Sequence, residues 1–364
     1  MRIAIIGTRG YPYVYSGYET FVKEISERFI KNNISVTIYC HKGLFEDRPK
    51  KINGIDLVYL PTIESKSLSQ FIHSFFSIIH FCFSDIKLLL VVNVANAPFG
   101  FITRLFGKKT LINVDGLEWK RPKWKGLGSK YFLFCAKIVK YSFNKIITDS
   151  FEMQKIYNGD FNTSSDVITY GPIKDPVDSS KILNKYNLRS HNYYFILGRL
   201  IPDNNADFIV KGFLKSNSKK KLLIVGDVPN QSKYSNTIKK YKSDSIIFTG
   251  YINDDIELSD LYKNCFAYFH GHEFGGTNPT LINALNFNCI ILALNTKFNK
   301  EMLSDGKYGY LFNKKLDSLV SLLNKVDSGN TRSNVNKVSK KKFVDINYNW
   351  DLISEKYLEI FRNI

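Results

Sequence analysis

The pattern of hydrophobic and polar positions in the first half of the chain alternates between two periods. Short runs of apolar, often β-branched residues are apolar on both faces, which is typical of buried parallel strands. Between the first two runs, Phe21, Val22, Ile25 and Phe29 recur at helical spacing within residues 19–31. The pattern predicts strands at residues 3–6, 36–39, 57–60, 88–92, 110–114, 146–148 and 167–169.

The same alternation restarts after residues 170–176, a turn-rich stretch with two prolines that is the candidate linker. Further strands are predicted at residues 193–197, 222–225, 246–249, 267–270, 290–293 and 310–312. Strands that alternate with helices indicate a doubly wound parallel sheet. We therefore predict an α/β protein with two Rossmann-like domains and a ligand-binding cleft between them.

The predicted N-terminal domain comprises residues 1–172, and the predicted C-terminal domain comprises residues 173–345. Residues 346–364 are predicted to form a helix, because Trp350, Ile353 and Tyr357 share one helical face. We expect this helix to pack back on the N-terminal domain.

Charge narrows the range of partners. The 364 residues carry a formal net charge of +18, which favours anionic partners. Residues 104–145 contain eleven basic residues and two acidic ones, a net charge of +9. This stretch is interpreted either as a solvated surface or as a docking surface for anionic lipid. Nucleic-acid binding is a remote alternative, because the sequence lacks RNP, KH, helix-turn-helix and zinc-finger patterns.

The five cysteines are scattered and form no CxxC pair, which argues against a disulfide framework or a zinc site and favours a reducing compartment. The longest apolar stretch, residues 71–83, is shorter than the roughly 20 residues that span a bilayer. We expect it to form a buried helix, with a membrane-surface helix as the alternative. The expected location is cytoplasmic, and peripheral at the inner face of the plasma membrane.

Candidate chemistry lies where the predicted strands end. Gly7, Gly10 and Gly17 follow the first strand but do not match the dinucleotide fingerprint, which disfavours a dehydrogenase. Residues 113–124 follow a buried strand and combine two carboxylates with two tryptophans, groups that can bond and stack on sugars. Arg199 follows a strand and Gly198, where its guanidinium can bind a diphosphate.

Residues 270–279, HGHEFGGTNP, are the most specific segment. Asn278 is predicted to cap a helix that begins at Pro279, and Gly275 and Gly276 bring main-chain N–H groups to this positive helix end. Such an arrangement suits a phosphate. A metal site formed by His270, His272 and Glu273 is disfavoured, because alternating strand side chains do not converge.

These motifs together resemble those of the family 4 retaining glycosyltransferases of the GT-B fold, and specifically of their bacterial rhamnosyltransferase-type branch. The motifs are IIGTRG (5–10), GYETF (17–21), DGLEWKR (115–121), GRL (198–200) and HGH with GGTNP (270–279). They extend over nearly the whole chain in the expected order. The resemblance implies a dTDP- or UDP-linked sugar as co-substrate, retention of anomeric configuration, and no separate cofactor or obligate metal.

Site residues follow from the same resemblance. The candidate catalytic residues are Asp115, Glu273 and Arg199. The candidate donor-binding residues are Arg199, His270, His272, Glu273, Gly275, Gly276, Thr277, Asn278 and Asn283. The candidate acceptor-side residues are Gly10, Gly17, Glu19, Glu118, Trp119 and Arg121.

The implied reaction transfers a hexose or deoxyhexose, with L-rhamnose from dTDP-rhamnose as first choice. The implied acceptor is a lipid-linked saccharide in bacterial surface polysaccharide synthesis, for example of capsule or O-antigen. Two departures stand out: Asn283 replaces an expected glutamate, and Asn204 and Asn205 replace an expected lysine. Alternatives are a degenerate or accessory transferase and a GT-B-type nucleotide-sugar epimerase.

Overall fold

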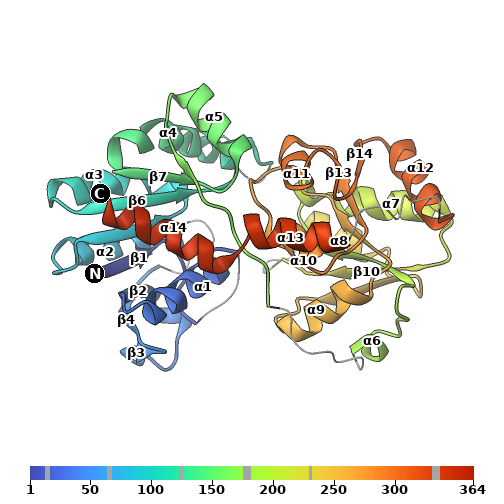
Figure 1. Ribbon diagram of the computed structural model, residues 1–364, viewed down its shortest axis with the longest axis horizontal. Helices are drawn as coiled ribbons and strands as arrows, with labels where there is room; N and C mark the ends of the chain where they lie inside the picture. The colour runs from blue at the N-terminus through green and yellow to red at the C-terminus, as the bar shows by residue number, and fades with distance from the viewer. Residues whose placement is uncertain are drawn as a thin grey trace. The chain divides into compact units, whose positions relative to one another are not determined.

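The structure is a computed structural model that describes residues 1–12, 17–63, 68–122, 124, 126–174, 182–228, 232–329 and 337–364. The chain divides into two compact units (Figure 1). The first unit comprises Met1–Gly171 and Asn349–Ile364, and the second comprises Pro172–Tyr348. Lys123 and Lys125 of the basic stretch, and Asp175 and Pro176 of the predicted linker, lie outside the described residues.

The first unit is built on a sheet with the strand order β3-β4-β2-β1-β5-β6-β7-β8. Its pairs are parallel except for β3 with β4. The strands are β1 (Arg2–Ile6), β2 (Ser35–His41), β3 (Lys51–Ile52), β4 (Ile55–Leu60), β5 (Leu88–Val92), β6 (Lys109–Val114), β7 (Lys145–Thr148) and β8 (Asp166–Val167). The central strands β1 and β5 are almost wholly buried, as expected where helices cover both faces.

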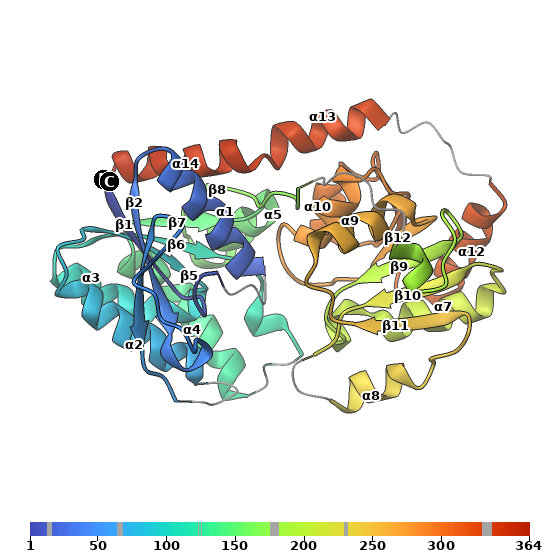
Figure 2. The ribbon, with the colours of Figure 1, turned by 90° about the horizontal axis from the view of Figure 1, so that it is seen from below.

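Helices α1 (Gly17–Lys31) and α14 (Trp350–Arg362) cover one face of this sheet, and α2 (Ser69–Cys82), α3 (Gly100–Leu105) and α4 (Leu127–Ser142) cover the other (Figure 2). Helix α5 (Phe151–Phe161) packs against α4, β7 and β8. The short 3-10 helices are η1 (Lys42–Leu44), η2 (Val94–Phe99) and η3 (Glu118–Lys120).

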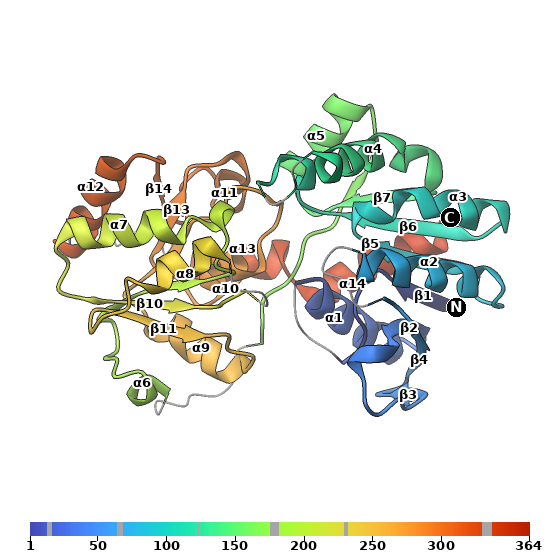
Figure 3. The same ribbon diagram turned by 180° about the vertical axis from the view of Figure 1, so that it is seen from behind.

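The second unit contains a parallel sheet with the order β11-β10-β9-β12-β13-β14. Its strands are β9 (Tyr193–Leu197), β10 (Lys221–Val225), β11 (Ile246–Gly250), β12 (Ala267–His270), β13 (Ile291–Leu294) and β14 (Tyr310–Phe312). Helices α7 (Ala206–Ser216) and α12 (Leu316–Asp327) lie side by side (Figure 3). Their residues Ile209 and Leu319 belong to one buried core with Leu222 of β10.

The remaining elements of the second unit are η4 (Pro202–Asn204), α6 (Ile182–Lys185), α8 (Lys233–Lys239), α9 (Asp255–Asn264), α10 (Pro279–Asn286), α11 (Lys297–Met302) and α13 (Lys337–Asn347). Two doubly wound parallel-sheet units confirm the predicted fold class. Strand β8 ends at Val167 rather than Thr169, and the sequence pattern did not reveal the two-residue strand β3.

Residues 71–83 were expected to form a buried helix, and the structure shows that helix α2 is buried on one face only. This buried face carries the apolar residues Ile78, Phe81 and Cys82 as well as His73, Ser74 and Ser77. Phe75, Phe76 and the following Phe83 are exposed instead. Phe81 of the same helix is fully buried, so the phenylalanines of α2 are divided between its two faces. The stretch is therefore half-buried rather than fully buried.

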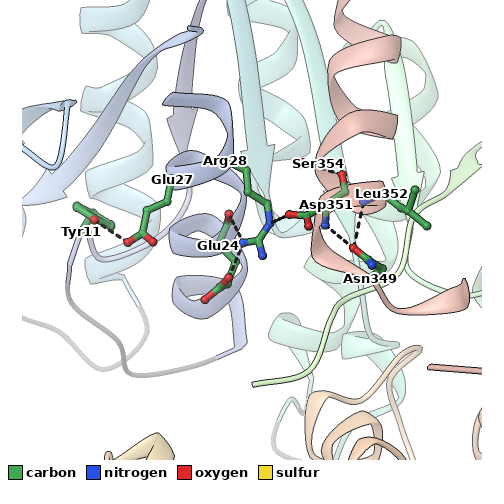
Figure 4. Close-up of polar contacts among 8 residues, drawn as sticks. All are labelled: Tyr11, Glu24, Glu27, Arg28, Asn349, Asp351, Leu352 and Ser354. Atoms are coloured by element: carbon green, nitrogen blue, oxygen red, sulfur yellow. Dashed lines mark hydrogen bonds and ion pairs between the residues drawn. The ribbon is translucent and has the colours of Figure 1, made fainter. Parts of the chain in front are cut away.

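The last helix, α14, docks on α1 within the first unit. The Phe21 ring lies 5.4 Å from the Tyr357 ring and 6.4 Å from the Trp350 ring, between centroids. At the edge of this contact, Arg28 Nε lies 2.6 Å from Asp351 Oδ1 (Figure 4). The side chain of Asn349 caps α14 by accepting hydrogen bonds from the amides of Asp351 and Leu352. Aromatic packing over a capped helix start holds the C-terminal residues on this unit.

Candidate functional site

In the first unit, the glycine-rich loop after β1 is held by a buried carboxylate. The Arg9 amide donates to Glu19 Oε1 at 3.2 Å, and the Arg9 guanidinium lies 3.6 Å from the same oxygen. Glu19 is buried at the start of α1, so it fixes the loop. Gly10 has φ +134°, and a Cβ there would lie 2.9 Å from Cys40 Sγ. Only glycine fits this turn. Gly17 begins α1 and is exposed.

Asp115 follows β6 and is half-buried. Its Oδ1 accepts a hydrogen bond from the hydroxyl of Tyr18 in α1, and its Oδ2 accepts one at 3.2 Å from Tyr170. Burial raises the pKa of the Asp115 carboxyl, and the tyrosine hydrogen bonds act in the opposite direction. The sequence predicted Asp115 but neither tyrosine, because these contacts join residues far apart in the chain.

The other acceptor-side candidates in this loop contact one another. Glu118 Oε1 lies 3.0 Å from Arg121 Nε, and Trp124 Nε1 donates to Glu118 Oε2 at 2.6 Å. The Trp119 ring makes edge contacts with Tyr157 and Phe161 of α5. Contacts within the loop and with α5 therefore fix the conformation of this loop. An acceptor role for Glu118, Trp119 and Arg121 stays a prediction.

In the second unit, Asn204 stabilises the loop that follows β9, and Asn205 joins this loop to the one that follows β12. Asn204 donates to the carbonyl oxygen of Arg199 at 2.9 Å. Asn205 donates to the carbonyl oxygen of Gly271 at 2.8 Å and to Glu273 Oε1 at 3.1 Å. A Cβ on Gly271 would meet the Asn204 carbonyl oxygen at 2.4 Å, so the two loops need a glycine where they meet. The asparagines that replace the expected lysine thus position the site.

Residues 275–279 form the start of α10. Asn278 accepts a hydrogen bond at 3.1 Å from the Thr280 amide, and Pro279 occupies the first turn, which confirms the predicted cap. Gly275 has φ +121°. Within the described part of the chain, the amides of Gly275 and Gly276 have no hydrogen-bond partner. These N–H groups at a positive helix end suit an anion.

The two histidines of this segment lie together. The His270 and His272 rings stack with centroids 4.4 Å apart. His270 is fully buried, and burial lowers its pKa to about 3, so this imidazole is neutral at physiological pH. Asn299 donates to the His272 carbonyl oxygen at 3.2 Å. His272 is half-buried, and its stacking on a neutral ring favours a role in shaping the loop.

A basic residue that the sequence pattern did not reveal lies beside Glu273. Lys314, in the loop after β14, forms an ion pair with Glu273 Oε1, and both side chains are partly exposed. With the exposed Arg199, this places cations in the loops after β9 and β14. Because carboxyl ends of parallel strands meet at one edge, these loops share that edge with residues 270–279.

Asn283 does not face open solvent. It is buried in α10, and its Oδ1 accepts a hydrogen bond at 2.9 Å from the main-chain amide of Ile173, at the beginning of the second unit. The side-chain oxygen therefore already has a partner, and Nδ2 is the polar atom left for a ligand. A ribose contact by Asn283 stays a prediction.

Among the described residues, no cluster of three or more His, Cys, Asp or Glu side chains is arranged to hold a metal ion. In the same residues, no helix has the length and apolar character needed to cross a membrane.

The two units match two different families. Residues 178–342 match the family Glycosyl transferases group 1, and residues 1–172 match a domain of unknown function, DUF1972. A search of curated proteins found no match to the sequence.

Solved structures resemble the whole chain. Sucrose-phosphate synthase from Thermosynechococcus elongatus is 15% identical with a TM-score of 0.79, covering 100% of this chain and 98% of its own. HepE from Anabaena, in complex with UDP and glucose, is 13% identical with a TM-score of 0.77, covering 100% of both chains. WaaG, a glycosyltransferase involved in lipopolysaccharide biosynthesis, is 13% identical with a TM-score of 0.71, covering 99% of both chains.

These structural similarities extend over both units and show the fold. The family match covers residues 178–342, which lie in the second unit. The chain therefore has the GT-B fold, and residues 178–342 of its second unit match the family Glycosyl transferases group 1.

Proposed function

We propose that this protein is a retaining glycosyltransferase that moves a hexose or deoxyhexose from a nucleotide sugar to a lipid-linked saccharide. L-Rhamnose from dTDP-rhamnose is the first choice of donor, and bacterial surface polysaccharide synthesis is the proposed setting. The observation that carries the proposal is the glycine pair at the capped start of α10, which lies in the group 1 domain. The HepE structures with UDP and with UDP-glucose support a nucleotide-sugar donor.

In the proposed donor site, the diphosphate would bind the amides of Gly275 and Gly276 together with Arg199. The bond between the anomeric carbon and the diphosphate oxygen breaks, and the anomeric carbon bonds to an acceptor oxygen. Negative charge then grows on the leaving diphosphate, where fixed N–H groups and cations stabilise it. The acceptor proton passes to the leaving phosphate or to Asp115. Such a site needs no metal ion.

Nucleotide binding tests the donor site. Arg199→Ala is expected to weaken binding of UDP or dTDP by roughly 10- to 100-fold, because a charge-assisted hydrogen bond contributes about 1.5–3 kcal/mol. Isothermal titration calorimetry measures the change. Arg189→Ala is the matched control, since this exposed arginine precedes β9 and lies at the opposite end of the same strand. Equal affinities of wild type and Arg199→Ala would contradict the assignment.

The proposed acceptor is lipid-linked, which requires access to a membrane. The helices on one face of the first unit expose Phe75, Phe76, Leu105, Leu127 and Phe134. The exposed cations Arg104, Lys109, Lys130 and Lys137 lie on or beside the same helices. Aromatic residues interspersed with cations suit the interface of an anionic bilayer. We propose that this α2–α3–α4 face binds anionic lipid; vesicle co-sedimentation tests the proposal.

A further inference from the structure

The carboxylate of Asp115 is held by two tyrosines from different elements. Tyr18, in the second position of α1, donates to Oδ1, and Tyr170, which follows β8, lies 3.2 Å from Oδ2. Each carboxylate oxygen can accept more than one hydrogen bond, so both keep a lone pair for a ligand. The tyrosines thus fix the orientation of the group without occupying it fully.

The Tyr170 hydroxyl has a second partner. It lies 3.2 Å from Asn113 Oδ1 as well as 3.2 Å from Asp115 Oδ2. A hydroxyl carries one hydrogen, so it can donate to one of these oxygens at a time. When Asp115 is ionised, Tyr170 donates to the carboxylate. When Asp115 has taken a proton, Tyr170 can donate to Asn113 and accept from the acid.

The network of hydrogen bonds around Asp115, Tyr170 and Asn113 extends to the C-terminal helix. Asn113 Nδ2 donates to the Tyr357 hydroxyl at 2.7 Å, and Tyr357 is fully buried in α14. Helix α14 is in turn anchored on α1 by Trp350 and by the Arg28–Asp351 ion pair (Figure 4). Two helices therefore support the position of Asp115: α1 supplies Tyr18, and α14 supplies Tyr357, which bonds Asn113 beside Tyr170.

Charged and titratable groups reach Asp115 from every neighbouring element. Glu118 and Arg121 belong to its own loop, Tyr18 to α1, and Tyr170 to the segment after β8. Tyr157 of α5 and Tyr357 of α14 also interact with it, and Asp149 lies close to Tyr18. The described groups that favour the ionised form are the Tyr18 and Tyr170 hydroxyls and the Arg121 guanidinium.

From this arrangement we propose that Tyr18 and Tyr170 are positioning residues that keep Asp115 ionised and oriented, with Asn113 and Tyr357 as their support. Asp115 would then accept the proton of the acceptor hydroxyl, and Tyr170 would turn its hydrogen to Asn113. The inference rests on the proposed function for the role of Asp115, but the hydrogen-bond network can be tested without any substrate.

The first test is a 13C-carboxyl NMR titration of Asp115, whose signal is the one lost in Asp115→Asn. Removing the Tyr18 hydroxyl in Tyr18→Phe deletes a donor to the charged form, so the pKa of Asp115 should rise by about one pH unit. Tyr39→Phe is the matched control, because this buried tyrosine of β2 bonds His80 instead. An unchanged pKa of Asp115 in Tyr18→Phe would overturn the proposal.

A second variant keeps the proposal testable if the first one does not fold. If Tyr18→Phe does not fold, Tyr170→Phe is titrated instead, with the same expected direction and the same contradicting outcome. In enzyme that turns over, the acidic limb of the pH profile of kcat/KM should move to higher pH by the same amount. If the NMR shift appears but no donor is turned over, the positioning network stands and the proposed function fails.

Discussion

At the scale of single residues, burial sets the protonation state of two histidines in the first unit. His41 and His73 are buried with ring centroids 3.9 Å apart, and burial lowers their pKa values to about 3 and about 4. Burial is the largest cause of both shifts. Neutral imidazoles inside the first unit therefore make its stability depend on pH.

The sign of this dependence follows from the lowered pKa. Between the folded pKa of about 4 and the ordinary value of 6.5, unfolded His73 binds a proton that folded His73 does not. Its contribution to stability is complete above pH 6.5 and is lost as the pH falls. From pH 7 to pH 5, this contribution should fall by about 2 kcal/mol.

Thermal unfolding at the two pH values measures the effect. His73→Phe should lose less stability on acidification than the wild type does. The control is His80→Phe, an exposed histidine on the same helix, which should behave as the wild type. Identical losses in wild type and His73→Phe would show that His73 does not carry the effect.

Residue chemistry was predictable where it is local. The Asn278 cap and the Pro279 helix start depend on neighbouring residues, so the sequence predicted them. Tyr18 with Asp115, and Lys314 with Glu273, join distant parts of the chain, and no periodicity indicates such pairs. The same holds for Asn283, whose bond to Ile173 could not be anticipated from the motif around it.

At the scale of elements, the buried parallel strands were predictable because their apolar runs are continuous. Strands β3 and β8 have two residues each and carry too little pattern to define their bounds. Helix α2 shows a different limit. Periodicity marks one side of a helix, but it could not show that this helix buries His73, Ser74 and Ser77 and exposes Phe75 and Phe76.

The exposed apolar residues of the α2–α3–α4 face provide the prediction at this scale. Phe83 and Leu105 have exposed fractions of 77% and 85%. Phe83 follows α2, and its ring lies 5.2 Å from that of Phe106, which follows Leu105 at the end of α3. Wild-type protein should co-sediment with phosphatidylglycerol vesicles, and added salt should weaken the binding. Replacing both residues by serine should reduce binding roughly tenfold or more, since each large apolar side chain contributes about 1.5–3 kcal/mol when buried.

The control for this experiment is Tyr251→Ser, which removes an exposed aromatic residue from the second unit. It should leave vesicle binding unchanged. Equal binding to neutral and anionic vesicles, or full binding by the Phe83→Ser/Leu105→Ser protein, would rule out this face as the lipid-binding surface.

At the scale of the whole molecule, the chain forms two α/β units, and its last helix returns to the first. The repeated strand–helix alternation predicted two units, and the aromatic face of α14 predicted a docked helix. The order of strands in each sheet was not predictable in detail, because it depends on which runs pair across long connections. Sugar and acceptor identity depend on side-chain contacts with ligands rather than on the fold.

The central claim is that the protein transfers a sugar from a nucleotide sugar to an acceptor. Its most direct test measures nucleotide release from a panel of dTDP- and UDP-sugars, with and without a lipid-linked saccharide fraction. We predict acceptor-dependent release, fastest with dTDP-rhamnose and strongly reduced in Arg199→Ala. Release that does not depend on the acceptor, or that is unchanged in Arg199→Ala, would contradict the claim.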